Sequence, residues 1–149
     1  MLPRVYLDTN VFIYAFEGNP SEVGHLLVFF EFLQSKVSAA MTSELTLAEL
    51  FASTRPNHLV DRIVYEKLLL GQEFIELRAI TRSVLIEAAD FRRENKLKLA
   101  DAIHVATAAQ SKCRYFVSAD KALKRLPVEM IHIRPTVEGV ANILEFFGA

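Results

Sequence analysis

The sequence has few of the features that mark secreted or membrane proteins. It contains a single cysteine, Cys113, which excludes an internal disulfide. Its N-terminus lacks the positively charged, apolar and cleavable pattern of a secretory signal, so we expect a cytoplasmic location. The most apolar stretch, residues 23–33, is interrupted by His25 and Glu31 and is far shorter than the ~20 residues needed to cross a bilayer. No membrane role is therefore expected.

Internal repeats, low-complexity tracts and linkers are also missing, which argues against a second domain. The chain has 149 residues and is 52% hydrophobic. A domain of this size buries roughly 70% of its unfolded surface. We therefore expect one domain spanning residues 1–149 that is stable without a disulfide.

The chain has no overall excess of positive charge, since its formal net charge is -1. The net charge therefore gives no support for a polyanionic partner. The distribution of charge is nevertheless uneven. Residues 92–125 contain nine Lys and Arg against three Asp and Glu, a net charge of +6, which leaves -7 for the rest of the chain. A nucleic acid could approach this segment through phosphate contacts, although a solvated helical surface explains such charges more simply.

Short apolar runs alternate with helical patterns along the chain. Strands are predicted at residues 5–7, 37–41, 115–117 and 130–133, with a short extended segment at 74–77. Helices are predicted at residues 11–16, 21–34, 57–70, 83–95, 102–110, 119–123 and 136–146, and another after a Thr42 or Ser43 cap. This alternation predicts a three-layer α/β/α fold around a mainly parallel sheet of four to five strands, since parallel strands need crossover connections.

Four acidic residues in predominantly apolar segments give the strongest functional signal. Asp8 and Asp120 follow predicted strands, whereas Glu49 and Asp101 lie in helix-like, Ala- and Leu-rich stretches. Ligand sites in open parallel sheets form beyond the carboxyl ends of the strands. Carboxylates that share a site repel one another, and hard divalent cations such as Mg2+ and Mn2+ relieve that repulsion. The pattern therefore predicts a metal site assembled by folding.

Each of these residues also has a simpler structural explanation. Asp8 and Asp101 could cap helices, and Asp120 could be an acidic residue in the first turn of a short helix. Glu49 is harder to explain, because its helix is apolar nearly all round and a buried unpaired carboxylate is costly. A buried ion pair with an Arg or Lys is the alternative for Glu49. Glu44 is explained by its place in the first helical turn and is left out of the site.

Four motifs, in this order, connect the acidic residues with a known family. They are Tyr-Leu-Asp-Thr-Asn at residues 6–10, Thr-Leu-Ala-Glu-Leu at 46–50, Leu-Ala-Asp-Ala-Ile-His-Val-Ala-Thr-Ala at 99–108 and Tyr-Phe-Val-Ser-Ala-Asp-Lys-Ala-Leu at 115–123. Over essentially its whole length the chain resembles the PIN domain family of metal-dependent ribonucleases. The resemblance is strongest to the toxin components of VapBC-type toxin–antitoxin systems.

The resemblance implies a PIN-like fold and hydrolysis of RNA phosphodiester bonds at a Mg2+ or Mn2+ site. The family's acidic, metal-binding and catalytic residues are matched here by Asp8, Glu49, Asp101 and Asp120. Asn10 and Ser118 match polar positions that orient those carboxylates, with serine in place of the commoner threonine. Ala122 stands where some relatives carry a further aspartate, so the number of metal ions stays open.

The resemblance also implies a homodimer and a small antitoxin whose tail blocks the active-site cleft, besides the RNA substrate. A solitary RNA-processing nuclease and a non-catalytic RNA-binding scaffold share the fold and stay open as alternatives. A phosphatase of the haloacid-dehalogenase type would use Asp8 as its phosphoryl acceptor. Such enzymes place a second aspartate two residues on, where this chain has Asn10.

Some residues with reactive or aromatic side chains are interpreted as structural. His104 lies one turn past Asp101 in the predicted helix, and we expect a packed histidine with a satisfied hydrogen bond. We expect core or interface positions rather than cofactor contacts for four others: Cys113, Phe29, Phe30 and Phe32.

Overall fold

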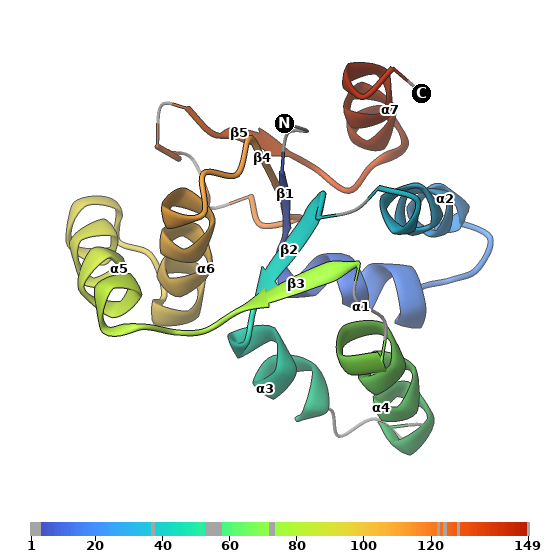
Figure 1. Cartoon of the computed structure of the whole chain (residues 1–149), viewed down its shortest axis with the longest axis horizontal. Helices are drawn as coiled ribbons and strands as arrows, with labels where there is room; N and C mark the ends of the chain where they lie inside the picture. The colour runs from blue at the N-terminus through green and yellow to red at the C-terminus, as the bar shows by residue number, and fades with distance from the viewer. Residues whose placement is uncertain are drawn as a thin grey trace.

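A parallel sheet of five strands forms the centre of the described part of the chain (Figure 1). The computed structural model describes residues 4–36, 38–52, 58–71, 74–121, 123, 125–127 and 129–148. The strands are β1 (Val5–Leu7), β2 (Ala40–Ser43), β3 (Ile75–Arg78), β4 (Tyr115–Val117) and β5 (Ile131–Ile133). Their spatial order is β3-β2-β1-β4-β5, and each neighbouring pair is parallel.

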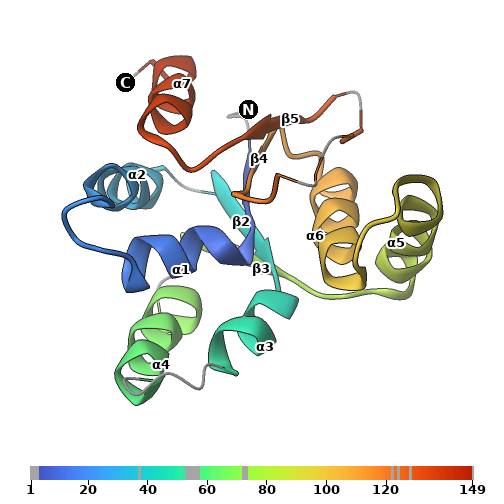
Figure 2. The same cartoon turned by 180° about the vertical axis from the view of Figure 1, so that it is seen from behind.

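Helices cover both faces of the sheet, which gives the three-layer α/β/α architecture expected from the sequence (Figures 1 and 2). One face carries α5 (Arg82–Asn95) and α6 (Leu99–Gln110). The other face carries α1 (Thr9–Glu17), α2 (Gly24–Gln34), α4 (His58–Glu66) and α7 (Val137–Phe146). The short helix α3 (Leu45–Phe51) follows β2 at the edge where β1 leads into α1.

Alternate residues of the central strands build two separate cores. Val5 and Leu7 of β1 join a cluster with residues of α1, α2, α4 and α7. Tyr6 points to the opposite face, where it packs with Phe116 of β4 and Val105 of α6. All these side chains are buried, as expected for parallel strands that are covered on both faces.

After β1, the chain adds β2 and then β3 on one side of β1. It then crosses to the other side of β1, where it adds β4 and then β5. Val5 pairs with Ala40 on one side and with Tyr115 on the other. The strand order therefore reverses between β1 and β4, and a crevice opens at such a switch point beyond the carboxyl ends of the strands. The residues that directly follow β1 and β4 line that edge of the sheet.

The second strand lies later in the chain than the predicted range of residues 37–41, because β2 spans Ala40–Ser43. Val37 lies outside the described residues. Thr42 is therefore a buried strand residue rather than a helix cap, and its hydroxyl donates to the Leu7 carbonyl oxygen at 2.7 Å. Ser43 still receives a hydrogen bond from the Leu45 N–H at 3.0 Å, which resembles the predicted cap.

The predicted short helix at residues 119–123 is wrong for the residues that the structure describes there, and Ala122 lies outside them. The first two backbone N–H groups of this segment donate to side chains. The Ala119 N–H donates to Asn10 Oδ1 at 3.1 Å, and the Asp120 N–H donates to Ser118 Oγ at 3.0 Å. These two contacts join the segment to Asn10 and Ser118.

The helix predicted at residues 57–70 is in fact α4 followed by a π-helical turn, Lys67–Gly71. The predicted boundary residues 54–57 lie outside the described ranges, and α3 ends at Phe51. Phe29 and Phe30 are buried in the core, Phe32 packs against Phe147, and Cys113 is buried beside Met41, as interpreted from the sequence. In the described ranges no helix is both long and apolar enough to cross a membrane.

Candidate active site

Asp8 lies at the carboxyl end of β1 and caps α1. It is 5% exposed, and its Oδ1 accepts a hydrogen bond from the Thr9 N–H at 2.8 Å. Its Oδ2 accepts bonds from Ser118 Oγ at 2.6 Å and from Asn10 Nδ2 at 3.3 Å. The capping role that the sequence offered as a simpler explanation is thus real, but it occupies only one oxygen of a carboxylate that also contacts the segment after β4.

Asn10 and Ser118 join the segments that carry Asp8 and Asp120. Asn10 Nδ2 lies 3.4 Å from Ser118 Oγ, and Asn10 Oδ1 accepts the Ala119 N–H. Ser118 Oγ accepts the Asp120 N–H while it donates to Asp8. His132 on β5, which the sequence analysis did not single out, adds a contact of 2.9 Å between its Nε2 and the Ser118 carbonyl oxygen. The two aspartates are therefore held at neighbouring strand ends.

Asp101 lies in the first turn of α6 and does not cap the helix, which begins at Leu99 after Lys98. The pKa of Asp101 is raised to about 6 by burial first, then by the negative charges of Asp120 and Asp8 and by a hydrogen bond with Asp120 that favours the protonated form. The protonated form of His104 acts in the opposite direction but does not offset them. Asp8, Asp101 and Asp120 are therefore close enough to interact electrostatically, although they are distant in the sequence.

Glu49 approaches this group from α3. This helix was predicted from the sequence, but it is not buried all round as expected. Its side chain is 34% exposed, and α3 has an open face that includes Ala48. The alternative explanation, an ion pair with an Arg or Lys, is also not what the described residues show. Glu49 Oε1 accepts hydrogen bonds from Thr9 Oγ1 at 2.8 Å and lies 2.6 Å from His104 Nε2.

The environment of Glu49 keeps it ionised. Burial by itself would raise the pKa of Glu49, but the hydrogen bond and the positive charge that His104 supplies when protonated, together with the Thr9 hydroxyl, leave the pKa lowered. Two neighbouring carboxylates thus have opposite shifts, since the pKa of Asp101 is raised. Opposite shifts within one group of titratable residues are common at functional sites.

His104 is a satisfied, buried histidine, as interpreted from the sequence, but its partners belong to the candidate site. It is 1% exposed, its Nδ1 lies 2.6 Å from the Tyr6 hydroxyl, and its Nε2 lies 2.6 Å from Glu49 Oε1. Burial and the charge of Asp8 raise the pKa of Tyr6 well above its usual value, so the phenol is protonated. In the sequence, the feature that could have placed His104 near the site was its position one helical turn after Asp101.

Comparison with known families and structures identifies the fold. A family model described as the PIN domain matches residues 5–129. The chain belongs to the PIN domain family. The resemblance recognised in the four sequence motifs and the fold class predicted with it are therefore confirmed. No curated protein sequence matches the chain.

Solved structures with the same fold include three toxin–antitoxin assemblies. A DNA-bound VapBC from Salmonella typhimurium has a TM-score of 0.69 and 18% identity, over 90% of this chain and 99% of that one. VapBC2 from Rickettsia felis, bound to a fragment of its promoter DNA, has a TM-score of 0.64 and 16% identity, over 87% and 97%. A toxin–antitoxin complex from Klebsiella pneumoniae has a TM-score of 0.63 and 20% identity, over 88% and 97%. At these identities the likeness establishes the fold.

The donors of this PIN domain fit a hard divalent cation by their chemistry. Within the described ranges, no three or more His, Cys, Asp and Glu side chains are already grouped closely enough to hold an ion. Besides burial, the negative charges of Asp120 and Asp8 raise the pKa of Asp101, so the three aspartates repel one another. Carboxylate oxygens are the ligands that Mg2+ and Mn2+ prefer, and a bound cation would remove this repulsion.

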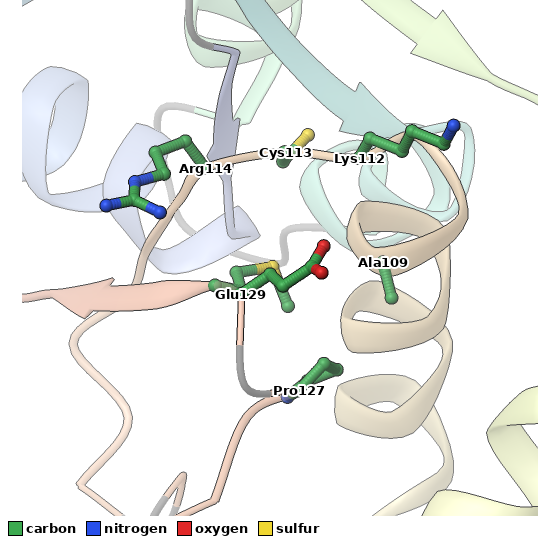
Figure 3. A pocket seen from close by; sticks show the side chains of 7 residues that line it. Ala109, Lys112, Cys113, Arg114, Pro127 and Glu129 are labelled. Carbon is green, nitrogen blue, oxygen red and sulfur yellow. The ribbon is translucent and has the colours of Figure 1, made fainter.

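A cavity of about 660 Å³ lies away from the carboxylates of the PIN domain (Figure 3). Its lining comes from the end of α6 and from the residues that precede β4 and β5, whereas Asp8 and Asp120 follow the carboxyl ends of strands. In Figure 3 the side chains of Lys112 and Arg114 point away from one another, and Glu129 projects between α6 and the strands. The cavity therefore offers no converging set of charges comparable to the aspartates.

Proposed function

We propose that this PIN domain is a Mg2+- or Mn2+-dependent ribonuclease that hydrolyses RNA phosphodiester bonds. The observation that carries the proposal is the placement of Asp8 and Asp120 at the ends of β1 and β4, both hydrogen-bonded to Ser118, with Asp101 close enough for their charges to add to burial in raising its pKa to about 6. The group lies at the β1–β4 switch point, where ligands bind in open parallel sheets. Family membership supports the same chemistry.

Asp8, Asp101 and Asp120 would hold the metal directly or through water. When bound, a divalent ion supplies a water of lowered pKa and neutralises charge on the phosphate oxygens. Glu49, kept ionised by its partners, would either complete the ligand set or accept a proton from the attacking water. Asn10 and Ser118 orient Asp8 and the start of the segment with Asp120 through their hydrogen bonds.

We further propose that the protein is the toxin of a VapBC-like pair, working in the cytoplasm as a single-domain homodimer with a small antitoxin as partner. The structures similar in fold are themselves toxin–antitoxin complexes. Exposed apolar side chains supply surfaces suited to protein partners, on α2 and α4 in particular. They are Leu27, Val28, Leu59, Val60 and Ile63, each between 45% and 65% exposed.

Cleavage of a mixed-sequence RNA with a quenched fluorophore tests the nuclease. We expect the purified protein to cleave with Mg2+ or Mn2+, to stop in EDTA, and to resume when excess metal is returned. The variant Glu44→Gln is the matched control, because Glu44 is an exposed acidic residue that immediately precedes α3, the helix of Glu49, and lies outside the group. Cleavage that persists in EDTA would contradict metal dependence, and metal-independent RNA binding without cleavage would favour the scaffold alternative.

Basic residues beside the aspartates are candidates for contacts with the RNA phosphates. Lys98 immediately precedes α6, three residues from Asp101, and Lys121 follows Asp120; both are exposed. In EDTA, where RNA stays intact, we expect the double variant K98A/K121A to bind single-stranded RNA more weakly. Its plot of log affinity against log salt concentration should be shallower by about 1.4, since each phosphate contact on a single strand contributes about 0.7.

The control for this experiment is Lys112→Ala. Lys112 is an exposed lysine of the same basic segment, but it lies beside the cavity at the other edge of the sheet. We expect its salt dependence to equal that of the unaltered protein. Equal losses for K112A and K98A/K121A would instead indicate a diffuse attraction of the whole basic segment.

A further inference from the structure

His104 forms a bridge between the core of the protein and the carboxylates. Its Nδ1 lies 2.6 Å from the hydroxyl of Tyr6, a fully buried residue of β1, and its Nε2 lies 2.6 Å from Glu49 Oε1. The same Nε2 lies 3.6 Å from Asp8 Oδ1 and 3.3 Å from Thr9 Oγ1. One imidazole thus contacts β1, the start of α1 and the exposed helix α3.

The partners determine where the imidazole protons lie. An ionised carboxylate only accepts hydrogen bonds, so the nitrogen that faces Glu49 must carry a proton. In the neutral ring the other nitrogen then accepts, and the Tyr6 phenol is its donor. The Tyr6 contact therefore selects the tautomer that donates to Glu49 and orients the ring.

Glu49 needs such a partner more than the other three carboxylates do. It has a longer side chain, it is 34% exposed, and it comes from α3, a helix of only seven residues. A long, partly exposed side chain loses rotamer freedom when it is fixed. Asp8, in contrast, is 5% exposed and is held by its own helix cap and by Ser118.

We propose that His104 is a positioning residue, which donates from Nε2 to Oε1 of Glu49 and so fixes the Glu49 carboxylate beside Asp8 for metal binding. Thr9 donates to the same oxygen, so Oε2 takes neither of these two bonds and is the oxygen presented to the metal. The inference rests on the proposed metal-dependent function. The role is geometric, and no proton transfer by His104 is part of it.

Two substitutions separate the two bonds of His104. In H104Q the amide nitrogen reaches about as far as Nε2, which keeps the donor to Glu49 and loses the contact with Tyr6. In H104N the amide reaches only about as far as Nδ1, which keeps an acceptor for Tyr6 and loses the contact with Glu49. Each variant loses one buried hydrogen bond, so their thermal stabilities should be similar and metal binding should distinguish them.

The deciding measurement is the dissociation constant of Mn2+ by titration calorimetry. We expect H104N to raise it by roughly 10–100-fold, the usual effect of removing a partner that orients a ligand. H104Q should recover most of the affinity. In a Glu49→Gln background H104N should add nothing, because His104 acts through Glu49. The control is His25→Asn, a half-buried histidine whose Nε2 lies 3.0 Å from the Pro135 carbonyl oxygen.

Equal weakening by H104N and H104Q, or an undiminished effect of H104N in the Glu49→Gln background, would overturn the positioning role. NMR of the metal-free protein provides a second readout. The Nε2–H proton of His104 should be protected from exchange and should lose that protection in Glu49→Ala but not in Asp120→Asn. If the Nε2–H proton is protected but the protein binds no Mn2+, the proposed metal-dependent function is overturned. The hydrogen bond between His104 and Glu49 would still be confirmed.

Discussion

Asp8→Asn is expected to lower metal-dependent RNA cleavage by roughly a thousandfold or more. The amide has nearly the same shape but no charge, so it removes a proposed metal ligand from the group with Asp101 and Asp120. Metal ions contribute several kcal/mol of charge stabilisation in the transition state, and each 1.36 kcal/mol is a factor of ten in rate. The measurement is initial cleavage rates of the two proteins at saturating Mg2+ and Mn2+.

The fold should survive this change. An asparagine oxygen can still accept the Thr9 N–H at the start of α1, and its NH₂ group can donate to Ser118 Oγ. The Ser118 hydroxyl, which donates to Asp8 in the unaltered protein, then needs another acceptor, and the long contact of 3.3 Å with Asn10 is lost. A typical hydrogen bond is worth about 1 kcal/mol net, and relief of repulsion offsets part of this cost. Equal cleavage by both proteins would reveal a contaminating nuclease, and an unfolded variant by circular dichroism would show that Asp8 is mainly structural.

Asp101→Asn is expected to make the metal-free protein more stable at neutral pH. In the folded protein the pKa of Asp101 is raised from 3.8 to about 6 by burial and by the charges of Asp120 and Asp8. The folded state therefore binds more protons than the unfolded chain between about pH 4 and pH 6, and stability falls as pH rises through this window. Above it, the ionised Asp101 destabilises the fold, and asparagine removes that effect.

The magnitude follows from the same values. The rise from 3.8 to about 6 sets an upper bound of about 3 kcal/mol at 1.36 kcal/mol per pH unit. Solvent screening of this partly exposed side chain reduces the effect to roughly 1–2 kcal/mol, or about 3–6 °C in Tm. The variant should thus melt higher than the unaltered protein at pH 7.5 in EDTA, and the difference should vanish near pH 4.

Added Mn2+ should reverse that order, because a ligand that binds only the folded state stabilises it by mass action. The unaltered protein should gain Tm with Mn2+ concentration, whereas Asp101→Asn should gain little. A variant that is less stable than the unaltered protein at pH 7.5 would show that Asp101 has a stabilising partner. A variant with the same Mn2+ response would exclude Asp101 from the metal site.

The sequence predicted well where local chemistry determines structure. Val5–Leu7 and Tyr115–Val117 are strands with the predicted bounds, because short apolar runs end there at polar residues. The same runs placed Asp8 and Asp120 at strand ends. The order of the strands was not predicted. It depends on pairings such as that of Val5 with Tyr115, and the sequence of one strand does not show which strand it pairs with.

The environment of Glu49 could not be inferred from its own segment. An apolar composition suggested a buried helix, but burial depends on which faces other elements cover, and α3 lies at the edge of the sheet with Glu49 partly open. In place of the Arg or Lys that the alternative explanation required, Glu49 contacts His104, 55 residues away in the sequence. Likewise, the contacts of the segment after β4 with Asn10 could not be read from that segment, for which the sequence predicted a short helix at residues 119–123.

The pairing of β1 with β4 also sets the earliest moment at which the group of aspartates can exist. The Oδ2 of Asp8 is held by Ser118, which lies 110 residues later in the chain, and Asp120 follows Ser118 by two residues. At ~5–20 residues per second, a ribosome needs roughly 6–22 s to travel from Asp8 to Asp120. During that interval every growing chain carries Asp8 and lacks Asp120. The group of aspartates, and any metal site that it forms, therefore cannot exist until the ribosome has passed Asp120.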